Sequence, residues 1–262
     1  MRHCLLAASF VLLVGDGAFA QTQQKPYEPE VGQGGKDVVW VPTPPALVEK
    51  MLDMARVTRD DLVMDLGSGD GRNIIAAAKR GARAIGVEYN PDMVALSTRL
   101  AAEAGVTGRA TFIEGDMYTA DISKATVMAL FLLPANLEKL RETFLALAPG
   151  TRLVMNTFDI PDWVSDAKET LGEGCVSWCT AHLYYVPAPV EGRWTTSRGD
   201  LTLRQAFQMV AGTLTTNGVA TTVSGRLRGT ELTLEADGAS LRAVVNGDRL
   251  EGTQLTGTRT RP

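Results

Sequence analysis

The sequence has few of the residues that most often bind metals or act as nucleophiles. It contains three cysteines and two histidines in 262 residues, and only Cys175, Cys179 and His182 lie beyond residue 20. These are too few to build the ligand sets of common metal centres. We therefore expect no bound metal, and we interpret His182, on an apolar segment, as a buried core imidazole.

The pair Cys175 and Cys179 raises the question of a disulfide. If residues 176–186 form one strand, the two Cα atoms would be about 13 Å apart, beyond the limit of about 7 Å for a disulfide. We therefore expect two small buried apolar side chains. A tight turn at this place would permit the bond instead.

Positive charge is also scarce. The chain carries 26 lysines and arginines against 30 acidic residues, a formal net charge of −4. Nucleic-acid-binding domains usually present a basic face or stripe, whereas the basic residues here are scattered among acids. The composition therefore argues against a nucleic-acid partner.

No apolar run reaches the length of about 20 residues that a membrane-spanning helix needs. Residues 4–14 are apolar, follow Arg2 and precede Ala18-Phe19-Ala20, which is the pattern of a signal peptide. We expect a signal peptide over residues 1–20, cleavage after Ala20, a periplasmic or secreted protein, and no stable membrane insertion. If translation starts further downstream, the protein would be cytoplasmic.

The rest of the chain divides into three parts. Residues 21–37, rich in Gln, Pro and Gly, are expected to form a flexible leader. Residues 38–193 alternate short apolar runs with helical periods, as in a parallel sheet wound with helices. Residues 194–262 have no helical period and carry hairpin turns such as Asn217-Gly218, which predicts a small antiparallel β appendage.

Individual elements can be placed within these parts. In the wound domain, strands are expected near 62–66, 83–88, 110–114, 126–132, 152–158 and 180–186, and helices near 44–55, 72–80, 92–104 and 135–147, with a further helix over 162–169. In the appendage, strands are expected at 201–214, 219–227, 230–236, 240–246 and 249–255.

A glycine loop connects the first expected strand to the next helix. Gly67, Gly69 and Gly71 allow a sharp turn and a close approach of ligand to backbone. A dinucleotide pyrophosphate prefers bare amides at a helix N-terminus, but this loop is flanked by Asp65 and contains Asp70. The two carboxylates favour S-adenosylmethionine (SAM), which carries an ammonium and a sulfonium and has no phosphate.

Two later strand ends carry acids that suit a nucleoside. Glu88 follows about 20 residues after the loop, where a carboxylate can accept both ribose hydroxyls. Asp116 follows the third strand and can accept the adenine amine, while Met117 packs on the ring. Because the carboxyl ends of parallel strands lie at one edge of a sheet, these residues should share one crevice.

These motifs resemble those of class I SAM-dependent methyltransferases over residues 38–160. The leader Trp40-Val-Pro-Thr-Pro-Pro45 is similar to the branch that contains mitochondrial lysine methyltransferases and uncharacterised bacterial relatives. The resemblance implies that the leader closes over SAM, with Trp40 and Thr43 near its methionine end. The predicted cofactor-binding residues are Trp40, Thr43, Asp65, Gly67, Ser68, Gly69, Asp70, Gly71, Glu88, Tyr89, Asn90, Gly115, Asp116 and Met117.

The predicted fold is α/β: a doubly wound, mostly parallel, Rossmann-like seven-strand methyltransferase sheet with a C-terminal antiparallel β appendage. The predicted activity is SAM-dependent N-methylation of a lysine-type amine on a protein or small molecule. In-line methyl transfer needs mainly positioning and desolvation, so no catalytic residue is assigned. Residues 132–134, Leu-Leu-Pro, replace the Asn/Asp-Pro-Pro-aromatic motif of related amine-modifying enzymes, which further disfavours nucleic-acid bases.

Two other functions stay open at this point. An exported protein could keep the SAM fold for binding alone, without catalysis, since SAM is made inside cells. An NAD(P)-dependent oxidoreductase is the third hypothesis, and the acidity of the glycine loop opposes it.

Overall fold

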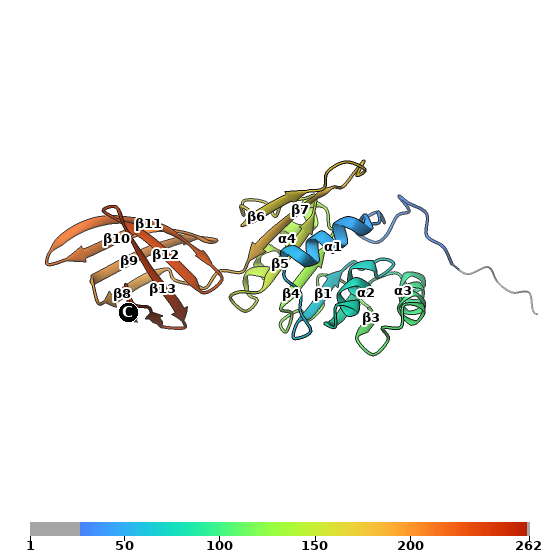
Figure 1. Ribbon diagram of the computed structural model, residues 1–262, viewed down its shortest axis with the longest axis horizontal. Helices are drawn as coiled ribbons and strands as arrows, with labels where there is room; N and C mark the ends of the chain where they lie inside the picture. The colour runs from blue at the N-terminus through green and yellow to red at the C-terminus, as the bar shows by residue number, and fades with distance from the viewer. Residues whose placement is uncertain (1–26, 261–262) are drawn as a thin grey trace, which may run out of the picture.

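The computed structural model describes residues 27–260, so the expected signal peptide lies outside the described residues. The described chain forms a wound α/β unit followed by a closed antiparallel barrel, and Figure 1 shows the barrel at the opposite end of the molecule from the leader. Within the described residues, no helix combines the length and apolar character needed to cross a membrane.

The wound unit is built on a seven-stranded sheet in the order β3-β2-β1-β4-β5-β7-β6. Strands β1 to β5 are mutually parallel, β7 pairs antiparallel with β5, and β6 pairs antiparallel with β7. The elements are α1 (Pro45–Met54), β1 (Leu62–Leu66), α2 (Arg72–Lys79), β2 (Arg83–Glu88), α3 (Pro91–Glu103), β3 (Ala110–Glu114), β4 (Val127–Leu130), α4 (Pro134–Leu145), β5 (Arg152–Asn156), β6 (Ala167–Thr170) and β7 (Thr180–Tyr185).

Helices cover both faces of this sheet. Buried side chains of α1 and α2 pack on one face with residues such as Val63 and Val154. Leu137, Leu140 and Phe144 of α4 pack on the other face. Their spacing of three and four residues forms one apolar stripe along the helix, which this packing requires. The predicted doubly wound methyltransferase fold with a β appendage is thereby confirmed.

The C-terminal unit is an eight-stranded closed barrel in the order β10-β11-β12-β13-β14-β15-β8-β9. Alternate residues point inward, and they form an almost purely apolar core that includes Trp194. The strands are β8 (Gly192–Thr196), β9 (Gly199–Ala206), β10 (Met209–Thr216), β11 (Val219–Arg228), β12 (Glu231–Ala236), β13 (Ala239–Asn246), β14 (Arg249–Glu251) and β15 (Gly257–Thr260).

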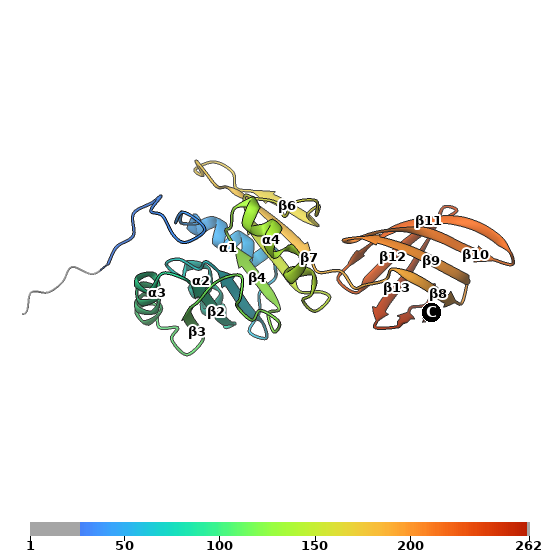
Figure 2. The same ribbon diagram turned by 180° about the vertical axis from the view of Figure 1, so that it is seen from behind.

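The barrel follows β7 after a short connection, which is visible from behind in Figure 2. It also contacts the sheet unit directly. Phe207 stacks on Trp163 with ring centroids 5.6 Å apart. Gln208 donates from Nε2 to the Val164 carbonyl at 2.6 Å, and Arg226 pairs with Asp166 at 2.5 Å. The two units therefore meet through stacking, hydrogen bonding and charge.

Two element predictions are wrong. The expected helix over 162–169 is not formed, and β6 occupies its second half. All four β6 residues are exposed, and the strand pairs only with β7 at the edge of the sheet, so it shows no apolar alternation. The expected strand 201–214 is two strands, because the chain turns at Phe207, whose φ is +53°.

The barrel also begins before the expected boundary at residue 193, since β8 starts at Gly192. The expected final strand 249–255 is present only as β14 over Arg249–Glu251, and β15 lies beyond it at Gly257–Thr260. The closed barrel is thus more complete than a set of appended hairpins, because β15 pairs with β8 and removes the open edge.

The expectation for the two cysteines is wrong as well. Cys175 and Cys179 form a disulfide with a Cα–Cα distance of 5.9 Å. Both are partly exposed rather than buried. The strand begins only at Thr180, so the two cysteines lie in the preceding turn, where residues four apart come close together.

Candidate active site

The glycine loop between β1 and α2 depends on its glycines for conformation and for space. Gly67, Gly69 and Gly71 have φ of +70°, +56° and +80°, a region that other residues rarely adopt. A Cβ on Gly69 would lie 2.8 Å from the indole nitrogen of Trp40. The leader therefore packs directly on the bare backbone of the loop.

Asp65 lies at the end of β1 and is only 3% exposed. Asn73 donates from Nδ2 to its Oδ2 at 3.0 Å, whereas Oδ1 has no hydrogen-bond partner. The hydroxyl of Ser68 is also buried without a partner. Burial raises the pKa of the Asp65 carboxyl well above its usual value, and the charges of Glu88 and Asp70 add to that rise. A cationic ligand group with N–H donors would satisfy this carboxylate.

Glu88 at the end of β2 is held in a fixed orientation. Its Oε2 accepts the Gly69 amide and its Oε1 accepts the Asn90 amide, both at 2.9 Å. Each carboxylate oxygen has a second lone pair available. The carboxylate is therefore preorganised to accept two further hydroxyl donors, as a ribose would supply.

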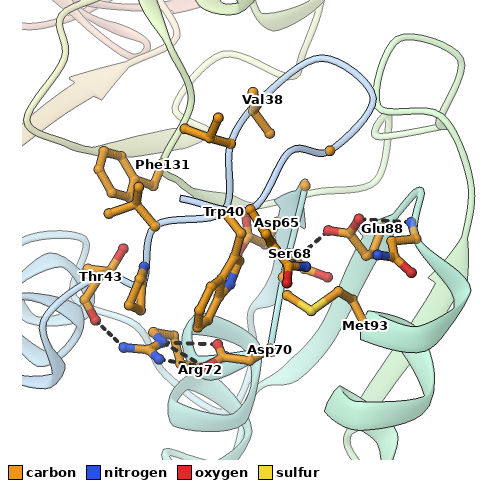
Figure 3. A pocket seen from close by; sticks show the side chains of 18 of the residues that line it. Val38, Trp40, Thr43, Asp65, Ser68, Asp70, Arg72, Glu88, Met93 and Phe131 are labelled. Carbon is orange, nitrogen blue, oxygen red and sulfur yellow. Dashed lines mark hydrogen bonds and ion pairs between the residues drawn. The ribbon is translucent and has the colours of Figure 1, made fainter. Parts of the chain in front are cut away.

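The leader covers the crevice between these residues, and Figure 3 shows the Trp40 side chain reaching into it. Thr43 anchors the leader at two points: its hydroxyl accepts Nδ2 of Asn156 at 3.1 Å, and its carbonyl accepts Nη1 of Arg72 at 2.6 Å. The remaining cavity is about 70 Å³.

Nine of the fourteen predicted cofactor residues border this cavity: Trp40, Thr43, Asp65, Gly67, Ser68, Gly69, Asp70, Glu88 and Asn90. Asp70 is neutralised there by Arg72, which lies 2.5 Å away. Gly71, Tyr89, Gly115, Asp116 and Met117 are not among the residues that border it.

Asp116 and Tyr89 instead contact the leader. The Lys36 ammonium lies 2.6 Å from Asp116 Oδ2 and 5.0 Å from the centroid of the Tyr89 ring. The hydrogen bond from Lys36 lowers the pKa of Asp116. The carboxylate predicted to accept an adenine amine is thus paired with a leader lysine in this structure.

Beyond the leader, sequence reasoning missed four residues that border the cavity: Arg72, Asn73, Met93 and Phe131. Asn73 and Met93 lie inside helices, and Phe131 follows β4. None of them belongs to a strand-end acidic motif. Only their proximity in the fold identifies them. Within the described residues, no group of three or more His, Cys, Asp or Glu side chains could hold a metal ion.

Comparison with known proteins agrees with this geometry. Residues 65–167 match the ANTKMT methyltransferase domain family. A protein-lysine N-methyltransferase of Saccharolobus islandicus (strain REY15A) is 44% identical over 152 residues, which cover 57% of this chain and 94% of that protein. The adenine nucleotide translocase lysine N-methyltransferase of Mus musculus is 35% identical over 48% of this chain, which spans only 55% of that relative's length.

A solved structure is similar over the same region. The RNA methyltransferase of Salinibacter ruber, in complex with S-adenosyl-L-homocysteine (SAH), has a TM-score of 0.54 and 43% identity, and the match covers 57% of this chain and 96% of that one. The matched region carries the glycine loop, Asp65 and Glu88, so SAM is the cofactor. The chain therefore belongs to the class I SAM-dependent methyltransferases, in the family of the protein-lysine N-methyltransferases.

Proposed function

We propose that this methyltransferase transfers the methyl group of SAM to a lysine amine on a protein acceptor. The observation that carries the proposal is the 44% identity with a protein-lysine N-methyltransferase across 94% of that relative's length. The family match over residues 65–167 includes the glycine loop, Glu88 and the loop after β4, where an acceptor would approach the methyl group.

In this proposal the strand-end carboxylates hold the cofactor. Asp65 accepts the ammonium of the methionine end through its unpartnered Oδ1, and Glu88 accepts the ribose hydroxyls. Asp116 accepts the adenine amine once Lys36 has left it. When bound, SAM supplies the electrophilic methyl group and its own leaving group.

The acceptor needs no dedicated base if the enzyme binds it as a neutral amine. Phe131, Leu132 and Leu133 follow β4 and border the apolar side of the crevice. An apolar environment disfavours the ammonium form of lysine and lowers its pKa, which exposes the nucleophilic lone pair. Positioning and desolvation would then supply most of the rate enhancement.

RNA is the competing acceptor, because the similar Salinibacter ruber protein is named an RNA methyltransferase. Two features of this chain favour protein. Its net charge of −4 gives no general attraction for a polyanion. Leu132 and Leu133 offer no side-chain hydrogen bond to the edge of a base.

Tritiated SAM separates these acceptors. The purified protein is incubated with envelope proteins, with total RNA and with free small amines, and Glu88→Gln serves as the matched variant. We expect label in lysine of a protein band, and much less label with the variant. Label in RNA alone would refute the proposed acceptor. Tight SAM binding with no transfer to any of the three would indicate the non-catalytic binding protein.

We also propose that the protein is exported. The pattern of residues 1–20 is that of a signal peptide, and a disulfide persists best in an oxidising compartment. Cell fractionation followed by N-terminal sequencing tests this. A mature chain that begins at Gln21 in the periplasmic or secreted fraction is expected, and an intact N-terminus in the cytosol would contradict export.

A further inference from the structure

Three aromatic side chains gather beside the cofactor crevice. Phe131 follows β4, Phe158 follows β5, and Trp178 lies in the disulfide turn before β7. Their ring centroids are 6.2 Å apart for Phe131 and Phe158, 5.6 Å for Phe131 and Trp178, and 5.7 Å for Phe158 and Trp178. The sheet thus brings together rings from three separate segments of the chain.

These rings border a second cavity of about 80 Å³ that adjoins the crevice. The two cavities share Phe131 and the leader residues Val38, Val39 and Val41. The second cavity therefore opens on the side of the crevice where Trp40 and Thr43 lie, the end assigned above to the methionine part of SAM. A group held by the rings would be next to the reacting methyl.

The side chains that border this second cavity indicate which kind of group it can bind. All the residues that border it are apolar, and none carries a charge. Such a site has no charged side chain for an anion, and the indole of Trp178 is its only side-chain hydrogen-bonding group for a sugar. Aromatic faces do attract an ammonium group, and the attraction grows when the cation is desolvated. An alkyl chain that ends in an amine or a methylated ammonium matches both properties.

Trp178 is held in place by the disulfide. Cys175 and Cys179 close a small loop that contains it, and the Trp178 backbone has a φ of +59°, which a residue with a Cβ rarely adopts. Thr157, next to Phe158, has a φ of +62°. Strained backbone of this kind persists where surrounding structure enforces it, and it concentrates at ligand sites.

We propose that Phe131, Phe158 and Trp178 form the binding site for the acceptor's alkyl chain and for the methylated ammonium that the reaction produces, and that the Cys175–Cys179 disulfide positions Trp178 as one wall of this site. The proposal rests on the proposed function, since it describes how the lysine side chain and its methylated product are held. Trp178 is 38% exposed, so the wall faces an entering side chain.

A binding experiment tests the site without methyl transfer. Butyltrimethylammonium, which mimics the end of a trimethylated lysine, is titrated into the SAH-saturated protein and followed by ligand-observed NMR. Choline and its neutral isostere 3,3-dimethylbutan-1-ol separate cation recognition from apolar burial. We expect butyltrimethylammonium and choline to bind, and the neutral alcohol to bind at least about 5-fold more weakly than choline.

Variants then locate the site. Trp178→Ala should weaken butyltrimethylammonium binding about 5-fold to 30-fold, and Trp178→Phe should weaken it less. Cys175→Ser with Cys179→Ser, or reduction by dithiothreitol, should have an effect between these two. Val176→Ser is the matched control, because Val176 is 96% exposed in the same turn and does not border the second cavity. SAH affinity should stay unchanged in all of them.

Equal binding of choline and the neutral alcohol, or full affinity in Trp178→Ala, would overturn the proposal. Its failure can be told apart from failure of the proposed function. If the wild type methylates protein lysine and Trp178→Ala does so with unchanged KM, the acceptor site is wrong and the function stands. If the wild type binds the cation but labels only RNA, the lysine function is wrong and the cation site stands.

Discussion

The wound unit and the barrel differ in what their interiors contain. Among the described residues, eleven polar or charged side chains are buried, and Gln208 is the only one of them in the barrel. Even Gln208 donates its hydrogen bond to Val164 of the wound unit. The barrel is filled by apolar side chains, whereas the wound unit buries several groups that lack a partner.

This difference indicates which of the two units binds the ligand. A buried polar group without a hydrogen bond costs stability, so a cluster of such groups beside a cavity marks a place where a ligand or water can complete them. Asp65, Ser68 and Asn73 each carry such an atom, and all three border the cofactor crevice. Since the barrel core has no such cluster, we expect the barrel to act through its outer surface and its attachment to the sheet.

The largest expected effect is a loss of stability in the barrel that leaves cofactor affinity unchanged. Trp194 is 1% exposed in the apolar core of the barrel, and its indole nitrogen donates to the Val190 carbonyl at 2.8 Å. Trp194→Ala should cost about 3–5 kcal/mol of unfolding free energy through the cavity it leaves. Differential scanning calorimetry measures this, and SAH titration should give an unchanged affinity. A large loss of SAH affinity would break the division between the two units.

The second-largest effect is expected in the wound unit. There a substitution should increase stability and weaken cofactor binding. Asp65→Asn removes a buried charge, so we expect the ligand-free protein to gain on the order of 1 kcal/mol at pH 7. SAM binding should weaken by about 1–3 kcal/mol, because the ammonium loses a charge-assisted hydrogen bond. Calorimetric titration and thermal unfolding measure the two changes.

A matched control for this variant is Asp61→Asn. Asp61 is also buried in the wound unit, but it pairs with Arg152 and accepts the amide of Thr58, and its pKa is lowered despite burial. Removing its charge should therefore decrease stability and leave SAM affinity unchanged. If both variants changed stability in the same direction, the distinction between a structural and a ligand-binding carboxylate would fail.

The same distinction explains how much the sequence could predict. The glycine loop and the strand-end acids Asp65 and Glu88 lie at fixed places relative to strands, so their meeting at one sheet edge was predictable. The ion pair between Asp116 and the leader residue Lys36 could not be predicted, because the two residues are 80 positions apart and no motif connects them.

The errors in the fold share a cause. Strand β6 is an exposed edge strand, and the disulfide turn lies just before β7, so neither contains the apolar periodicity that sequence patterns detect. The aromatic group of Phe131, Phe158 and Trp178 was missed for a related reason. In the sequence, each of these aromatic residues looks like an ordinary core residue. Only the sheet topology brings the three rings together.

A smaller effect should appear where the two units meet. Arg226 of the barrel is half exposed and pairs with the nearly buried Asp166 of the wound unit. Arg226→Ala should cost about 1 kcal/mol, since Asp166 keeps the hydrogen bond from the Tyr185 amide at 2.9 Å. We expect the calorimetric transitions of the two units to separate further. Arg204→Ala, an exposed change elsewhere on the barrel, is the control and should leave them in place.

The smallest effect concerns pH, and it should distinguish the two units by their titratable groups. The barrel contains no histidine, whereas the wound unit contains His182, which is 1% exposed. Burial lowers the pKa of His182 from its ordinary 6.5, while the neighbouring Asp159 acts in the opposite direction and Lys168 adds to the lowering. Below pH 6.5 His182 is therefore protonated more fully in the unfolded chain than in the folded one, and its contribution to stability falls as pH decreases.

Asp65 acts with the opposite sign, because its raised pKa makes the folded chain hold a proton that the unfolded chain releases above pH 3.8.

The experiment therefore uses Asp65→Asn as background and adds His182→Asn. Between pH 7 and 5, the background should lose stability with a slope below the limit of about 1.4 kcal/mol per pH unit, since Asp159 partly offsets burial. The double variant should lose this slope in the transition of the wound unit. The transition of the barrel should have the same pH dependence in both proteins, because neither substitution lies in it. If the slope survived in the double variant, a group other than His182 would control the acid response of the wound unit.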